Sequence, residues 1–186
     1  MATALFFERG FEAVTIDEIA VAAKVSKMTV FNYFSRKEEL MLDREDDLKL
    51  LSFRQALRER LDGKPPIEAL RALVQELSGQ KHPLCSVNTQ AVNWWRVLAA
   101  SPSLQARLRE FGDEAAEGLA IELAGPKPDG LTRLMAGMIV LTLRTAREEA
   151  IRLMERGGSA KKANAAFLAL MEQGLSAVET LAVNLA

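Results

Sequence analysis

Hydrophobic and polar positions alternate with a helical period along nearly the whole chain. Apolar side chains recur three and four residues apart, and Gly- and Pro-containing stretches such as 62–66 and 125–130 separate the periodic segments. This pattern is typical of amphipathic helices that each bury one face in a common core. We therefore predict an all-α fold of about nine helices, over residues 1–9, 16–23, 27–34, 36–61, 67–77, 84–100, 102–124, 134–156 and 160–185.

Side chains that cap backbone N–H groups stand where the early helices should begin. Thr15 and Glu18 form the capping box Thr-x-x-Glu at the second helix, and Ser26 is placed to cap the third. Ser35 and Glu38 repeat the box and predict the start of a long fourth helix. Two short helices joined by a tight turn are typical of a helix-turn-helix.

The third helix has an unusual outward face. At about 100° per residue, Val30 and Phe34 face the core, and Val25 enters the core just before the helix. A plain solvated face would carry Glu, Lys or Gln. Here the opposite side is largely polar and aromatic, and it consists of Lys27, Met28, Thr29, Phe31, Asn32 and Tyr33.

Charge is balanced over the chain and concentrated only locally. The 186 residues carry 24 basic and 25 acidic side chains, so the net charge of −1 gives no nucleic-acid signal. Between Lys24 and Lys37, however, the cations Lys24, Lys27, Arg36 and Lys37 occur with no acidic residue among them. Because such cations neutralise phosphates, we interpret this segment as the part that docks on double-stranded DNA.

From Leu5 to Leu40 the sequence resembles the TetR/AcrR family of bacterial transcriptional regulators. The shared elements are Phe6-x-x-x-Gly10-Phe11, Thr15-x-x-x-Ile19-Ala20, Val25-Ser26, Thr29, Tyr33-Phe34 and Lys37-x-x-Leu40. The resemblance implies a helix-turn-helix DNA-binding domain over residues 1–45. It also implies a helical ligand-binding and dimerisation domain over residues 46–186. The basic arm that usually precedes the first helix in this family is absent from this sequence, which is a departure from the family pattern.

The resemblance also assigns roles to the outward face of the third helix. It places Lys27, Met28 and Phe31 near base edges, and Thr15, Thr29, Tyr33 and Lys37 near phosphates, while Asn32 suits either contact. Met28 stands where many members of the family have glycine, so we expect a different sequence readout.

A small apolar effector is expected among the middle helices, where the resemblance places a pocket. The candidates for lining it are Asn88, Trp94, Trp95, Leu98, Phe111, Met138 and Thr142. Asn88 is a polar amide on an apolar stripe and so needs a partner, which a ligand would supply. The alternative is that both tryptophans simply fill the core.

The last two predicted helices suggest a homodimer. In the final helix, Phe167, Met171, Gly174, Val178, Leu181 and Leu185 repeat at heptad-like spacing beside many alanines. Two such helices from each subunit would form a four-helix bundle. The alternative is that both helices form the core of a monomer.

Other classes of protein receive little support. His82 and Cys85 are spaced as HxxC, but a metal site needs more ligands, and a catalytic pair needs an orienting acid. No phosphate-binding glycine loop or nucleophile elbow is present. We therefore predict a protein that is not an enzyme and has no cofactor. A single cysteine and no apolar run of about 20 residues indicate a cytoplasmic protein that does not insert into membranes.

The sequence thus predicts a homodimeric, ligand-responsive transcriptional regulator. We expect a repressor that a small apolar effector releases from a palindromic operator by shifting the long fourth helix. The alternatives are an activator or effector-independent regulator of the same fold, and a helical protein that binds small molecules but not DNA.

Overall fold

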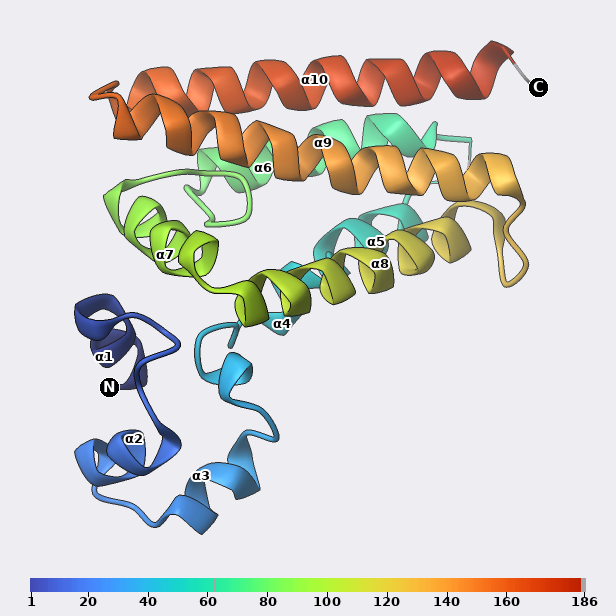
Figure 1. Ribbon diagram of the computed structural model, residues 1–186. Coiled ribbons are helices and arrows are strands. Elements are labelled where there is room, and N and C mark those ends of the chain that lie inside the picture. The colour runs from blue at the N-terminus through green and yellow to red at the C-terminus, as the bar shows by residue number, and fades with distance from the viewer. Residues whose placement is uncertain (62, 185–186) are drawn as a thin grey trace.

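The computed structural model describes residues 1–61 and 63–184, and all regular structure among them is helical. The helices are α1 (Ala2–Arg9), α2 (Ile16–Ala23), α3 (Lys27–Tyr33), the 3-10 helix η1 (Lys37–Leu40), α4 (Glu45–Leu48), α5 (Leu51–Arg58), α6 (Pro66–Gly79), α7 (Thr89–Ala100), α8 (Pro102–Ala124), α9 (Gly130–Glu155) and α10 (Ala160–Asn184) (Figure 1). The prediction of an all-α fold is confirmed, although the described residues form more helices than the nine expected.

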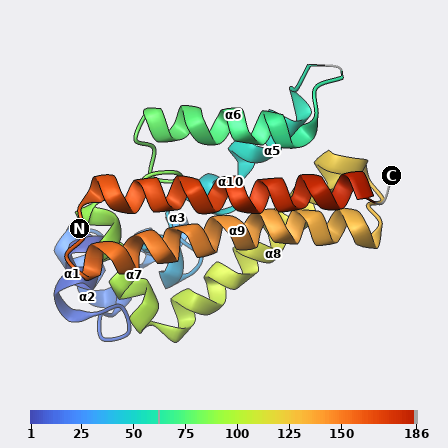
Figure 2. The same cartoon turned by 90° about the horizontal axis from the view of Figure 1, so that it is seen from above.

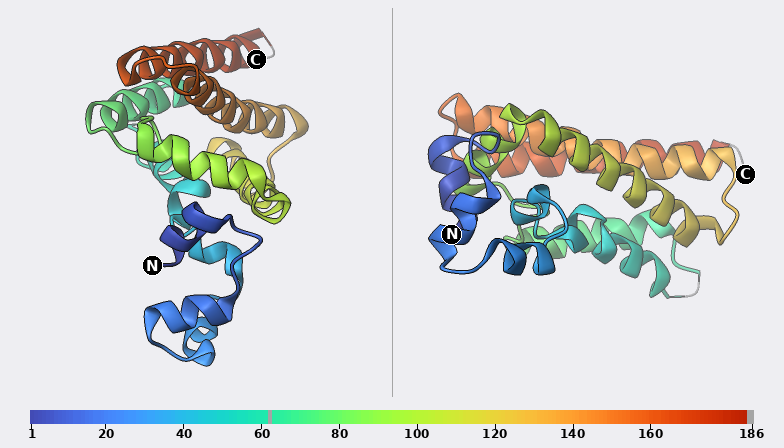
Figure 3. Two further views of the ribbon diagram at one scale, coloured as in Figure 1. Left: turned by 60° about the vertical axis from the view of Figure 1, so that its left-hand side comes forward. Right: turned by 60° about the horizontal axis from the view of Figure 1, so that its bottom comes forward.

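The helices are arranged in two unequal groups. The short helices α1, α2 and α3 form one end of the molecule, and the long helices α9 and α10 run side by side at the other (Figures 1 and 2). Helix α8 packs against α9, and α6 packs against α10. The further views confirm that α2 and α3 lie at the opposite end from α9 and α10 (Figure 3). The outward face of α3 therefore has no neighbouring helix to cover it.

A single hydrophobic cluster joins the two groups. Phe6 and Phe11 pack with their rings 4.8 Å apart, and their cluster also contains Leu98 at the end of α7 and Leu104 and Phe111 of α8. A second, larger cluster fills the space between α5, α6, α7, α8, α9 and α10. The division into domains at residue 45 stays a prediction, and this shared cluster shows that the residues on its two sides pack together.

The prediction of one long fourth helix over 36–61 is wrong. The segment is divided into η1, α4 and α5, and Leu50 interrupts it with a left-handed backbone, at φ 52°. The consecutive residues Met41 and Leu42 are only 2% and 1% exposed. Two neighbours in a surface helix cannot both face one core, so burying both requires an irregular backbone. The second capping box is also wrong, because the backbone N–H and hydroxyl of Ser35 donate to Glu39 instead of pairing with Glu38.

Helix α7 begins at Thr89 rather than at Leu84, as predicted. Asn88 is the N-cap, and its side-chain oxygen accepts a hydrogen bond from Ala91 N–H at 2.9 Å. The non-helical residues before α7 can be buried because their backbone finds partners. Asn164 of α10 donates to the carbonyl of Val87 and accepts from the Val87 N–H. Asn164 thus replaces the backbone partners that a helix would have supplied.

The heptad-like seam of α10 packs inside the protomer. Phe167, Met171 and Val178 are buried in the larger cluster, so they do not supply the exposed surface on which the dimer prediction relied. Leu185, which belongs to the same predicted seam, lies outside the described residues. Small residues allow α9 and α10 to approach closely: a Cβ on Gly174 would lie 2.3 Å from the Thr142 hydroxyl oxygen.

Replacing Gly174 with alanine should therefore weaken this helix pair. We expect Gly174→Ala to lower the free energy of unfolding by about 1–3 kcal/mol, because the added methyl group meets Thr142. Gly137→Ala is the matched control, since a Cβ there meets no atom within 4 Å, and it should stabilise by up to about 1 kcal/mol. Urea denaturation followed by circular dichroism would measure both, and equal effects would contradict the packing argument.

Candidate nucleic-acid interface and ligand cavities

Local capping fixes the geometry of the α2–turn–α3 unit. The Thr15 hydroxyl accepts from Glu18 N–H, and the Glu18 carboxylate accepts from the Thr15 N–H and hydroxyl at 2.8 Å, which confirms the first capping box. Lys24 ends α2 with a left-handed backbone, and Ser26 caps α3 through Thr29 N–H. These bonds satisfy free N–H groups at both helix starts, so the two short helices keep a defined angle.

The outward face of α3 is exposed as predicted. Met28, Phe31 and Tyr33 are 71%, 46% and 79% exposed, whereas Val30 is buried. Val25 is 41% exposed, so the prediction that it enters the core is wrong. Large apolar and aromatic side chains gain nothing from being held in water. Their exposure at the end of the molecule therefore indicates a contact surface.

Three of the four predicted cations have partners within the protein. The Lys27 amine pairs with Asp17 at 2.9 Å, and the Arg36 guanidinium lies 3.6 Å from Glu110. The Lys37 amine donates to the Phe11 carbonyl and lies 4.3 Å from the centre of its ring. An exposed ion pair such as Lys27–Asp17 is weak, so the lysine can readily leave the aspartate and pair with a phosphate. Lys37 instead holds the start of η1 against the loop after α1, so its amine faces inward.

Polar contacts reinforce the junction between the two groups of helices. The hydroxyls of Ser101 and Ser103 donate to the Glu12 carboxylate, and the bond from Ser101 is the main reason that the pKa of Glu12 is lowered. On the other side, the Trp94 indole N–H donates to the Met41 carbonyl at 3.1 Å. The start of α8 and the middle of α7 therefore hold the segments on either side of the helix-turn-helix.

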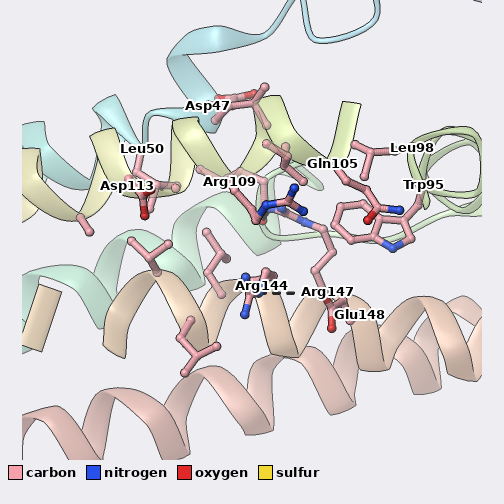
Figure 4. A pocket seen from close by; sticks show the side chains of 18 of the residues that line it. Asp47, Leu50, Trp95, Leu98, Gln105, Arg109, Asp113, Arg144, Arg147 and Glu148 are labelled. Atoms are coloured by element: carbon pink, nitrogen blue, oxygen red, sulfur yellow. Dashed lines mark hydrogen bonds and ion pairs between the residues drawn. The ribbon is translucent and has the colours of Figure 1, made fainter. Parts of the chain in front are cut away.

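Two cavities lie between this junction and α9. The larger, of about 630 Å³, is bounded mainly by α8 and α9, and the smaller, of about 320 Å³, lies between α7 and the segment 41–48 (Figure 4 shows the larger). Volumes of this size are typical of small-molecule sites. The described residues contain no group of acidic, His and Cys side chains suited to a metal ion.

Some of the predicted ligand-binding residues line these cavities and others do not. Asn88 and Trp94 line the smaller cavity, Leu98 lines the larger, and Trp95 lines both. Asn88 already has a backbone partner as the N-cap of α7, so it does not require a ligand.

Three of the predicted ligand-binding residues line neither cavity. Phe111 is buried in the cluster that joins the two groups of helices, Met138 packs against the larger cluster, and Thr142 faces Gly174. These side chains pack between helices. The periodicity of apolar residues along one helix does not predict whether a residue packs against another helix or lines a cavity.

Sequence reasoning missed the polar residues of the larger cavity. Gln105 and Arg109 of α8 and Arg144 and Arg147 of α9 line it, and Figure 4 shows Arg109 and Arg147 projecting into the space between these helices. The arginines of α9 belong to an amphipathic segment, and its periodicity does not tell what lies opposite its charged side chains. Only the position of α8 across from them turns that face into a cavity wall.

His82 and Cys85 do not form a reactive pair. Burial raises the pKa of the Cys85 thiol to about 12, so the thiol stays protonated at neutral pH. The His82 ring instead contacts Arg44 and lies 3.9 Å from Asp47. No helix in the described part of the chain is long and apolar enough to cross a membrane.

Comparison with known proteins agrees with these features. A family model described as bacterial regulatory proteins, tetR family, matches residues 1–43. The chain is 49% identical over 39 residues to the uncharacterized HTH-type transcriptional regulator YdeS of Bacillus subtilis (strain 168). The aligned residues make up 21% of this chain and 20% of that protein. It is 40% identical over 77 residues to the HTH-type transcriptional activator FasR of Mycolicibacterium smegmatis (strain ATCC 700084 / mc(2)155), which is 40% of this chain and 34% of that protein. The chain thus spans between a fifth and about a third of the length of these relatives.

A solved structure resembles the fold over nearly its whole length. A protein from Mesorhizobium loti MAFF303099, assigned there to the TetR family of transcriptional regulators, superposes with a TM-score of 0.53 at 19% identity. The superposition covers 95% of this chain and 92% of that one. At this identity the likeness concerns the fold alone.

The capped α2–turn–α3 unit, mounted on a helical region that encloses cavities, defines a helix-turn-helix protein of the DNA-binding class. The tetR family model matches this same unit, over residues 1–43, which supports the resemblance to the TetR/AcrR family over that segment.

The capping box should make the stability of α2 dependent on pH. Hydrogen bonds from the Thr15 N–H and hydroxyl, together with Arg9, lower the pKa of Glu18 from 4.5 to about 2. Because the folded-state pKa is lowered, the stabilisation is present above pH 4.5 and is lost as the pH falls toward 2. We expect Glu18→Gln to increase amide exchange in α2 at pH 7, with a difference from the parent protein that shrinks through this interval.

Amide exchange measured by NMR across this pH range would test the expectation. Glu8→Gln on α1 is the control, because Glu8 has no described partner among the ion pairs and hydrogen bonds, and it should leave exchange in α2 unchanged. A difference for Glu18→Gln that persists undiminished near pH 2 would contradict a role for the ionised carboxylate.

Proposed function

We propose that the protein is a sequence-specific, ligand-responsive transcriptional regulator that binds a palindromic operator as a homodimer. The observation that carries the proposal is the exposed face of α3, where Met28, Phe31 and Tyr33 lie in solvent at the free end of the molecule. In a helix-turn-helix the second helix enters the major groove. In a two-fold dimer, two copies of α3 would enter successive grooves of a palindrome.

The contacts we propose follow the chemistry of each side chain. Lys27, Met28 and Phe31 would approach base edges, where an apolar side chain can touch a thymine methyl and a lysine can pair with guanine. Thr15, Thr29, Tyr33 and Lys37 would hold phosphates, and Asn32 would do either. For Lys37 this requires the amine to leave the Phe11 carbonyl. Thr15 and Thr29 already take part in the caps of α2 and α3, so the backbone near each cap would contribute to the phosphate contact.

We propose that a small, largely apolar effector enters the cavities and changes the position of α3. Trp94 lines the smaller cavity and at the same time donates to the Met41 carbonyl, immediately after η1. A ligand that moves Trp94 would therefore move the segment that follows the helix-turn-helix. This route replaces the rigid long helix that the sequence predicted, because η1, α4 and α5 are separate short helices. The effector acts only through its preference for one of two conformations.

The direction of regulation has two candidates. We propose a repressor that the effector releases from its operator, as the sequence reading expected. An activator is the second candidate, because the relative FasR is named as a transcriptional activator. Transcription in vitro from a template carrying the selected operator would distinguish them, since the protein should lower transcript yield as a repressor and raise it as an activator.

Two variants of α3 should separate sequence readout from general DNA affinity. Met28→Gly should change which bases are preferred at one operator position, because it removes an apolar contact from the groove face. Tyr33→Phe should weaken binding to all sequences by roughly 0.5–1.5 kcal/mol, because it removes one phosphate hydrogen bond and little else. Selection from a randomised duplex pool gives the preference, and fluorescence anisotropy at several salt concentrations gives the affinity.

Ser159, the residue just before α10, provides the control for this experiment, since Ser159→Ala lies at the far end of the molecule and should bind DNA like the parent protein. Uniform loss of affinity in both α3 variants would contradict our division of the contacts. Absence of any salt-sensitive, sequence-preferring binding by the parent protein would instead favour a helical protein that binds only small molecules.

We further propose that the dimer forms through the outer faces of α9 and α10. The buried seam of α10 is used within the protomer, but its outer face carries the exposed small residues Ala165, Ala169 and Ala177, which would allow a second copy to approach closely. Ala169→Glu should therefore shift the protein toward monomer in sedimentation velocity. Ala4→Glu, an exposed alanine of α1, is the matched control and should leave the sedimentation coefficient unchanged. A dimer that withstands Ala169→Glu would place the interface elsewhere.

A further inference from the structure

The guanidinium of Arg147 occupies the place where the two cavities meet. Five residues line both of them: Asp47, Leu48, Leu84, Trp95 and Arg147. The cavities therefore share one wall, and Arg147 reaches it from α9 (Figure 4). It is the only cationic side chain common to both linings.

Arg147 is half-buried and has few partners for a cation in that position. One of its terminal N–H groups donates to the Leu84 carbonyl at 2.9 Å, and no carboxylate of the described residues lies within 4.0 Å of it. The shared acid Asp47 is already paired with Arg44. The neighbouring Arg144 differs, because its side chain is about half exposed and lies 3.9 Å from Glu148.

The free N–H groups of Arg147 make this wall a site for an anion. A guanidinium offers five N–H donors in a planar fork that matches a carboxylate. Burial lowers the pKa of Arg147 from its ordinary value, which shows that the surroundings oppose the charge. A bound anion would satisfy the remaining donors and offset the cost of keeping the cation away from water.

The walls around this cation are mostly apolar. Leu50, Leu98, Leu108, Val140 and Leu143 also line the larger cavity. The indole of Trp95 stands beside them and belongs to both cavities. A ligand that lay along these walls would need an apolar body. Arg109 and Arg144 also line the larger cavity, but Arg147 is the cation at the wall that both cavities share.

We propose that the cavities bind an amphipathic organic anion, whose carboxylate pairs with Arg147 and whose apolar body lies along α8 and α9. This inference rests on the proposed ligand response and names the chemical class of the effector. A purely apolar effector would leave the free donors of Arg147 buried without partners, which is the less favourable arrangement. The acid could be aliphatic or aromatic, since the recognised chemistry is the same.

Calorimetric titration of the full chain with matched acids and alcohols would test the proposal. The probes are decanoate with 1-decanol, and 1-naphthoate with 1-naphthylmethanol, so that each pair differs mainly in charge. The charge-assisted bonds should make at least one acid bind about tenfold tighter than its alcohol or more. Which pair responds would tell whether the body of the effector is aliphatic or aromatic.

Variants at two arginines make the test specific. Arg147→Met keeps the length and should remove the preference for the acid, while Arg147→Lys keeps the charge without the planar fork and should retain part of it. Arg144→Met is the matched control, because it lines the same cavity in an exposed ion pair, and it should keep the full preference. Thermal melts followed by circular dichroism would confirm that each variant is folded.

Several outcomes would overturn the proposal. Equal binding of acid and alcohol, an acid preference that survives Arg147→Met, or no binding of either acid at millimolar concentration would each do so. DNA selection on the same protein tests the regulatory function separately. An effector site of another chemistry and a protein that does not bind DNA are therefore distinguishable results.

Discussion

The packing of Phe6 and Phe11 against the junction of α7 and α8 is the contact on which the rest of the structure depends. A unit of three short helices cannot bury enough apolar surface to be stable alone. Here its aromatic residues share a cluster with Leu98, Leu104 and Phe111, so the larger region completes the core of the smaller. The orientation of α3 is therefore fixed by residues more than 60 positions further along the chain.

The same dependence makes the molecule suited to regulation. Leu98 belongs to the shared cluster and also lines the larger cavity, and Trp94 links the smaller cavity to the Met41 carbonyl. A ligand in either cavity would thus contact side chains that also pack against the segments on either side of the α2–turn–α3 unit. The segment 41–50, whose only helix is the short α4, lies between them, and a change in packing can alter its path without breaking a long helix. An anion at Arg147 would act at the cavity wall that Asp47 and Leu48 of this segment help to form.

Much of the N-terminal site could be predicted from local patterns. The Thr15–Glu18 box and the Ser26 cap depend on residues three apart, and such contacts form wherever a helix begins. The exposure of Met28 and Tyr33 followed from turning one helix by about 100° per residue. The partners of Lys37 and Arg36 could not be predicted in this way, because Phe11 and Glu110 come from other parts of the chain.

The sequence by itself determined the helical class, the capped helix-turn-helix and the resemblance of residues 1–43 to the TetR/AcrR family, because each depends on short-range spacing. Only the tertiary structure decided where the fourth segment breaks, which faces of α10 are buried, and which residues enclose a cavity. Periodicity identifies the apolar side of a helix but not its neighbour. Thr142 and Arg147 show the consequence, since the first packs against Gly174 and the second reaches a cavity. Whether a side chain packs against another helix or lines a cavity depends on which helices folding places beside it.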